Sequence, residues 1–208
     1  MKKSVSLLII TTFLLTLVTG CKKDKGDPPV LPPAESMTID FSNFEGGTKS
    51  DISVPKGTET SNWEFSAGVA MLWKAIIYTN LVVPVYSFQL AVDQKPVYLD
   101  DKTWQWSCNA TVMTVTYGAR LTGQITETNV LWKMYITKEG TGGYTDFLWF
   151  EGTSKLDGTQ GQWKLYESQQ NPVEILQIDW TSTADKIGML KYSYTNSGSE
   201  FKDSYIEY

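Results

Sequence analysis

The chain has 208 residues, of which 41% are hydrophobic and 13% aromatic, and its formal net charge is −5. This length suits one domain with a well-filled core, and an acidic chain without a basic cluster is a poor partner for nucleic acid. There is no histidine, and the only cysteines are Cys21 and Cys108. These absences exclude His-based triads and His-ligated metals. We therefore expect no metal and no cofactor.

The first 20 residues have the pattern of an export signal. Lys2 and Lys3 precede an apolar stretch, Val5–Val18, that is too short to span a bilayer. It closes on Leu-Val-Thr-Gly-Cys21, which resembles the lipobox of bacterial lipoproteins in its aliphatic residue three before the cysteine and its small residues between. The resemblance implies that residues 1–20 are removed and that Cys21 carries a lipid that anchors the chain in a membrane.

Residues 21–35 are predicted to be the lipidated cysteine and a tether. A charged Lys-Lys-Asp-Lys stretch leads into the proline-rich run 28–33. Such a run favours an extended polyproline conformation and offers nothing to a core. At about 3.1 Å per residue, the tether would hold the domain roughly 40 Å from the bilayer.

A single β-rich domain is predicted over residues 36–208, with one or two helices near its start. Alternation around Met37 predicts a short strand over residues 37–41. Behind a capping box at Ser61–Glu64, apolar residues at helical spacing predict a helix that ends near residues 78–80. They are Phe65, Val69, Leu72, Trp73 and Ile76. The next run, 81–92, fits a strand or a helix with Pro84 in its first turn, and we favour the helix.

From Thr103 onward the chain consists of strand patterns separated by short polar breaks. The first strand holds Trp104 and Trp106, and later strands are expected at 111–121, 130–137, 144–152, 162–167, 173–180, 187–194 and 201–208. The breaks leave no room for crossover helices, so consecutive strands should pair antiparallel. The predicted fold is mainly β, a meander forming an up-and-down β-barrel or curled sheet with the helices packed on it. A β-sandwich of the same strands is the alternative.

Tryptophans spread over these strands form the candidate binding site. Rings on one face of a meander pool into one surface, where they can stack on an apolar or carbohydrate ligand. The candidate contacts are Trp104, Trp106, Trp132 and Trp149, with Trp163 and Trp180 in the same set. The competing interpretation is that these rings fill the core. Cys108, beside Trp106, is expected to be a small buried residue.

The acidic residues of the strand region do not define a catalytic pair. A glycosidase would need two carboxylates at a set separation, and nothing in the spacing selects two from Asp146, Glu151, Glu167 and Asp179. No phosphate-binding loop, dinucleotide fingerprint or nucleophile motif is present. We therefore expect no catalytic residues and no enzymatic activity.

The whole chain is similar to outer-membrane and surface lipoproteins of Bacteroidetes, which combine a lipobox, a proline-rich tether and a Trp- and Tyr-rich β domain. The resemblance implies an outer-membrane location, facing the periplasm or the cell surface, and no particular reaction. The predicted function is that of a monomeric, membrane-anchored binding module for an apolar or carbohydrate ligand. The alternative is a structural or assembly partner of an outer-membrane complex.

Overall fold

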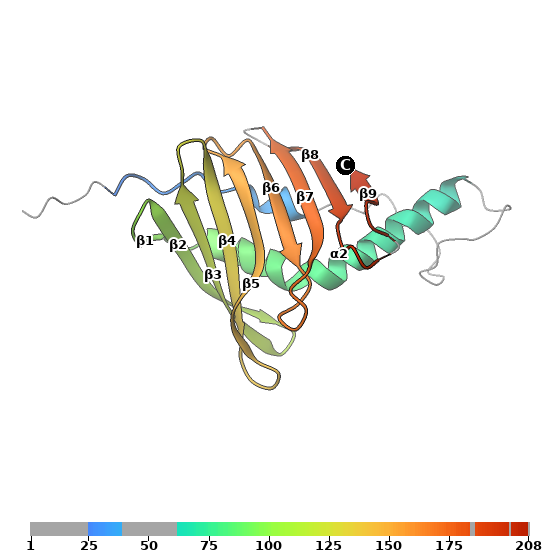
Figure 1. The fold of residues 1–208 in the computed structure, drawn as a ribbon, viewed down its shortest axis with the longest axis horizontal. Helices are drawn as coiled ribbons and strands as arrows, with labels where there is room; N and C mark the ends of the chain where they lie inside the picture. Colours follow the sequence, from blue (N-terminus) through green and yellow to red (C-terminus); the bar gives the residue numbers. More distant parts are fainter. Residues whose placement is uncertain (1–24, 39–61, 184–185, 200, 208) are drawn as a thin grey trace, which may run out of the picture.

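The computed structural model describes residues 25–38, 62–183, 186–199 and 201–207, apart from the side chains of 62–67, 72 and 79. One antiparallel sheet curls around a long helix (Figure 1). In chain order, the elements are η2 (Ala34–Met37), α2 (Asn62–Val92), β1 (Val97–Tyr98), β2 (Thr103–Val112), β3 (Val115–Ile125), β4 (Asn129–Lys138), β5 (Tyr144–Lys155), β6 (Gln160–Tyr166), β7 (Glu174–Ser182), β8 (Ile187–Tyr194) and β9 (Tyr205–Glu207).

The sheet is a meander in which each strand pairs antiparallel with the next, from β1 to β9. The two outer strands form the edges of the sheet and are not paired with each other, so the sheet is not closed. This confirms the curled-sheet form of the predicted fold, with helices packed on it. The structure adopts neither the closed barrel nor the β-sandwich.

Strand alternation places one continuous apolar layer on the face that the helix covers. Registered neighbours follow one row across the sheet, and all of them are buried: Trp106, Leu121, Met134, Phe150, Leu165 and Leu176. From α2, Phe88 reaches this layer and meets the rings of Phe150 and Trp163 edge-on, at 6.1 and 5.5 Å. The helix and the sheet therefore share one core.

Buried tryptophans cover glycines on adjacent strands. Trp132 is paired with Gly123, Trp163 with Gly152 and Trp180 with Gly161. A Cβ added at Gly123 would lie 2.5 Å from the Trp132 ring, and one at Gly161 would lie 2.5 Å from the Trp180 ring. Each indole thus lies flat over backbone that has no side chain, an arrangement that compensates for glycine in a strand.

Helix α2 is bent in its middle. Its two halves, Gly68–Tyr78 and Asn80–Val92, meet at 59°. Pro84 has no N–H to donate to the carbonyl of Asn80 four residues earlier, and proline in a helix interior produces such kinks. The Asn80 side chain itself donates to the Ile76 carbonyl at 2.7 Å. The predicted helix therefore continues through residues 78–80 and bends there, and the favoured helical reading of 81–92 is correct.

The N-terminal segment from Lys25 to Thr38 packs along the sheet on the same side as α2 (Figure 1). Pro29 and Pro32 are buried and Leu31 packs against the core. This differs from the expectation that residues up to 35 have nothing to bury, because proline rings are themselves apolar and fill space well. The segment expected to be a free tether is packed on the domain from Pro29 onward.

Three strand predictions need correction. Met37 belongs to the short helix η2 rather than to a strand, and residues 39–41 lie outside the described part. The predicted strand 111–121 is split by a turn at Met113, so that its first residues end β2 and the rest form β3. The last predicted strand is shorter than expected, because residues 201–203 form turns before β9.

Candidate functional site

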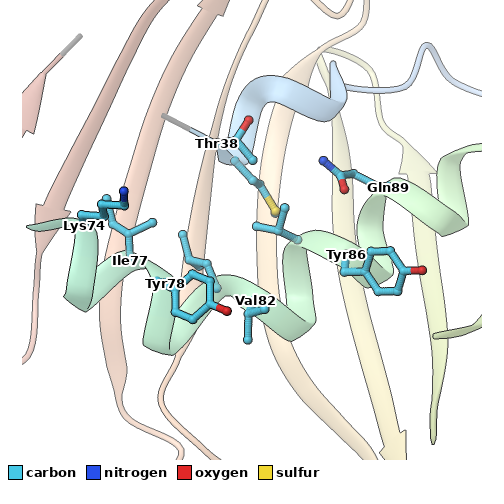
Figure 2. A pocket seen from close by; sticks show the side chains of 10 residues that line it. Thr38, Lys74, Ile77, Tyr78, Val82, Tyr86 and Gln89 are labelled. Atoms are coloured by element: carbon cyan, nitrogen blue, oxygen red, sulfur yellow. The ribbon is translucent and has the colours of Figure 1, made fainter. Parts of the chain in front are cut away.

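An open apolar groove lies between η2 and the bent helix α2 (Figure 2). Its volume is about 340 Å³, at the lower end of the range of small-molecule sites. It is lined by Met37, Thr38, Lys74, Ile77, Tyr78, Leu81, Val82, Val85, Tyr86 and Gln89. Seven of these ten side chains are apolar or aromatic, and Thr38, Lys74 and Gln89 are the polar ones.

Two stripes of α2 form the wall of the groove, because helix residues four apart lie above one another. One stripe is Ile77, Leu81, Val85 and Gln89, and the other is Lys74, Tyr78, Val82 and Tyr86. The first stripe leans toward the sheet, where Ile77 and Leu81 are buried. The second is open, and the Tyr78 and Tyr86 side chains are 65% and 41% exposed.

The floor and ends of the groove differ in character. Met37, the last residue of η2, is fully buried, and the next residue, Thr38, also lines the groove (Figure 2). Lys74 lies at one end and Gln89 at the other. The kink at Asn80 falls between the two exposed tyrosines, so the groove follows the bend of the helix. An apolar groove with polar groups at its ends suits an amphipathic ligand.

Two of the four predicted tryptophan contacts are core residues. Trp106 and Trp132 are each 1% exposed, and their rings pack together at 5.8 Å between centroids. Trp132 Nε1 donates to the Ser154 hydroxyl at 2.9 Å, which satisfies the one polar atom of the ring. Burial leaves neither ring a face for a ligand. For these two residues, core packing is the interpretation that the geometry supports.

Trp163 and Trp180 are buried in the same way, at 0% and 1% exposure. Trp163 Nε1 donates to the hydroxyl of Ser36 at 3.0 Å. Trp180 Nε1 is buried and has no hydrogen-bond partner within the described structure. The sheet therefore contributes four buried indoles to the core, and the helix that covers them is the reason that these rings do not line a cavity.

The remaining predicted contacts, Trp104 and Trp149, are half-buried. Each of them contacts aromatic rings other than those of Trp106 and Trp132. Trp104 meets Tyr98 edge-on at 5.3 Å, beside the β1 edge. Trp149 belongs to a cluster on β5, where its ring lies 5.7 Å from Phe147 and 6.3 Å from Tyr144. Neither residue lines the groove along α2.

Two register irregularities in β5 assemble the cluster around Trp149. The pairing with β4 shifts between Met134 and Tyr135 and again between Ile136 and Lys138. In an unbroken strand, Tyr144 would lie on the opposite face from Phe147 and Trp149. The irregularities bring all three rings together, and bulges of this kind often re-aim side chains near binding sites. Burial and the nearby Tyr117 raise the pKa of Tyr144 to about 12.

The four carboxylates considered for catalysis are each held by a different partner. Asp146 forms an ion pair with Arg120 at 3.2 Å, and Glu151 accepts from the Tyr166 hydroxyl at 2.7 Å. Glu167 accepts from Asn171, and Asp179 accepts from Gln162 and Gln177. Within the described ranges, no group of three or more acidic or cysteine side chains is placed to hold a metal ion.

Cys108 was expected to be buried, and it is half-buried and packs against the core. Its thiol donates to the Ser87 carbonyl at 3.6 Å. Burial raises the pKa of the Cys108 thiol, which lowers its reactivity. Cys21 lies outside the described residues, so its assignment as the lipid attachment site stays a prediction.

By length and hydropathy, none of the described helices could cross a membrane as a single span, and only the bent pair of segments in α2 passes the test as a combined span. Comparisons with protein-family models, with curated proteins and with solved structures find no match to this chain. The candidate site therefore has to be judged on its own geometry.

The sequence analysis did not predict the groove, because it sought binding residues only among the tryptophans of the strands. The signal that could have found it is the spacing of Lys74, Tyr78, Val82 and Tyr86, which recur every four residues. Had residues 62–92 been treated as one helix, that helix would have been apolar on every side. Such a helix needs a partner on each face.

Proposed function

We propose that this protein is a membrane-anchored lipoprotein whose domain binds an apolar or amphipathic small molecule without catalysis, in the groove between η2 and α2. The observation that carries the proposal is the groove itself, which is open, about 340 Å³ in volume and lined by Val82, Val85 and two exposed tyrosines. Aliphatic walls favour a hydrocarbon chain, since each buried CH₂ contributes about 0.8 kcal/mol.

The chemistry of the lining supports binding over catalysis. The titratable groups of the groove are Lys74, Tyr78 and Tyr86, with no carboxylate, cysteine or histidine among the lining residues. General acid–base or nucleophilic catalysis would need a positioned pair of such groups. Amphipathic tyrosines at the rim suit a ligand with one apolar and one polar end.

A fluorescent fatty acid titrated against the purified domain tests the groove. Val82→Gln places an amide in the apolar wall, and we expect it to weaken binding about tenfold, which corresponds to about 1.4 kcal/mol. The matched control is Leu131→Gln, since Leu131 is a 38% exposed residue on β4 outside the groove. Equal affinity of the two variants, or no saturable binding by the native domain, would contradict the proposal.

The membrane anchor has its own test. Cys21→Ser removes the thiol to which the lipobox resemblance assigns the lipid, so we expect loss of fatty-acid labelling and release from the membrane fraction. Cys108→Ser is the control, because Cys108 packs inside the domain. Membrane retention or labelling of Cys21→Ser would refute the anchor and leave the groove proposal standing.

The cluster on β5 supports a second candidate, a carbohydrate site. Trp149 and Tyr144 are half-buried rings held by two irregularities of their strand, and flat rings stack on sugars. Trp149→Phe keeps an apolar ring of different shape, and Trp149→Ala removes it. Intrinsic fluorescence titrated with oligosaccharides separates the two sites, because a sugar bound here would not compete with the fatty acid.

A further inference from the structure

The first described residue of the chain lies at the free β1 edge of the sheet. The ammonium of Lys25 lies over the ring of Tyr98, 5.6 Å from its centroid. The same corner is where the N-terminal segment meets the sheet in Figure 1. The contact between Lys25 and Tyr98 thus fixes the position of residue 25 beside β1.

Covalent geometry limits how far this corner can lie from the lipid. Only four residue steps separate Lys25 from Cys21, and an extended chain spans at most about 3.6 Å per residue. The Cα atoms of Cys21 and Lys25 are therefore at most about 14 Å apart, whatever the conformation between them. A lipid on Cys21 would place the bilayer surface within about that distance of the Lys25 backbone, and the Lys25 side chain reaches the β1 edge.

The chemistry of the corner suits such a surface. Val97 and Leu99 flank Tyr98 and are 59% and 46% exposed. Exposed aliphatic side chains next to a tyrosine and a lysine form the composition that membrane interfaces favour, because the ring and the lysine stem are apolar and their ends are polar.

Charge attraction contributes little to this contact. The corner has three lysines, Lys25, Lys95 and Lys102, against Asp100 and Asp101, a net charge of +1, and all five are exposed. With a charge this small, the contact depends mainly on apolar burial. It should therefore vary only weakly with salt and should not need anionic lipid.

We propose that the β1 corner, made of Lys25, Val97, Tyr98 and Leu99, rests on the membrane interface and sets the orientation of the domain. This proposal rests on the lipid anchor at Cys21. The opposite end of β2 then points away from the bilayer. That end carries Met113, which is 89% exposed, and it lies about 33 Å away, since β2 has 10 residues with a rise of about 3.3 Å each.

A depth measurement tests the orientation. Full-length lipidated protein is reconstituted in vesicles of phosphatidylethanolamine with a minor share of phosphatidylglycerol. An environment-sensitive fluorophore is attached at Leu99→Cys or, as the matched control, at Met113→Cys, each in a Cys108→Ala background. Quenching by a lipid that carries a nitroxide near its headgroup is expected to be at least roughly twofold stronger at position 99 than at position 113.

Each outcome separates the two proposals. Equal quenching at both positions, or stronger quenching at position 113, in protein that stays with the vesicles would overturn the orientation and leave the anchor intact. Protein that does not associate with vesicles would overturn the anchor. Hydrogen exchange on the unsubstituted lipoprotein gives a second readout, with slower exchange expected at residues 97–102 on vesicles and no change at residues 112–115.

Discussion

The indole of Trp163 donates a hydrogen bond to the hydroxyl of Ser36 at 3.0 Å, and both side chains are fully buried. The two residues are 127 positions apart in the chain. This bond joins the N-terminal segment to the middle of the sheet, and it satisfies two polar atoms that would otherwise be costly in an apolar core.

Removal of the Ser36 hydroxyl should destabilise the domain. Ser36→Ala leaves Trp163 Nε1 buried without an acceptor, and the expected cost is about 1–3 kcal/mol in the free energy of unfolding. Chemical denaturation followed by tryptophan fluorescence measures it. Ser107→Ala is the control, since Ser107 is exposed on β2. A Ser36→Ala protein as stable as the control would show that the bond contributes nothing.

The glycines beneath the tryptophans should not tolerate a methyl group. In Gly161→Ala the new Cβ would meet the Trp180 ring at 2.5 Å, and overpacking of this kind costs about 1–3 kcal/mol. Gly118→Ala is a matched control on β3, where the nearest atoms would lie at ordinary contact distances of 3.7 and 3.8 Å. The difference between the midpoints of denaturation of the two variants reports the clash, and equal midpoints would argue against it.

Alanine substitutions should divide the predicted tryptophan contacts into two classes. Trp106→Ala and Trp132→Ala remove fully buried rings, and each is expected to cost about 3–5 kcal/mol of unfolding free energy. Trp149 is only half-buried, so Trp149→Ala should cost clearly less. Thermal and denaturant unfolding of the three variants checks this order. A Trp149 variant as unstable as the others would place that ring in the core as well.

The domain should lose stability between pH of about 10 and 12. Burial and the bond to Glu151 raise the pKa of Tyr166 to about 12, and the pKa of Tyr144 is also raised to about 12, while the unfolded chain titrates near pH 10. In that interval the unfolded state releases protons that the folded state keeps, so the free energy of unfolding falls as pH rises. Denaturation of Tyr166→Phe should show a weaker pH dependence than denaturation of Tyr205→Phe, which changes an exposed tyrosine. The same slope in both would contradict this assignment.

Strand positions were largely predictable from the sequence, and one turn was not. The breaks at Gly, Asn and Pro matched the ends of most strands, because those residues are required at tight turns. The turn between β2 and β3 is formed at Met113 with a positive φ of 57°. Methionine is not a residue that marks turns, and it rarely adopts a positive φ. The sequence therefore predicted one strand over residues 111–121, where the structure has the end of β2, a turn and the start of β3.

The candidate site was less predictable because burial depends on what covers a face. Strand parity correctly placed Trp106 and Trp132 on one surface, but it did not show that Phe88 and the rest of α2 fill the space above them. The same helix then leaves its other side open and creates the groove at Tyr78 and Tyr86. Asn80 and Pro84 are residues typical of helix ends, so the sequence predicted a helix end near residues 78–80 where the structure has one long, kinked helix.

The meander topology has a consequence for the order of assembly. Every strand finds its partner in the next strand along the chain, so most sheet contacts close short loops and can form quickly. The segment of Ser36 is the exception, because η2 contacts β7 and β8 near the other end of the chain. During synthesis the N-terminal residues emerge first, yet their binding surface is completed last. The sheet should therefore assemble as a series of hairpins, and the N-terminal segment should dock in a late, separate step.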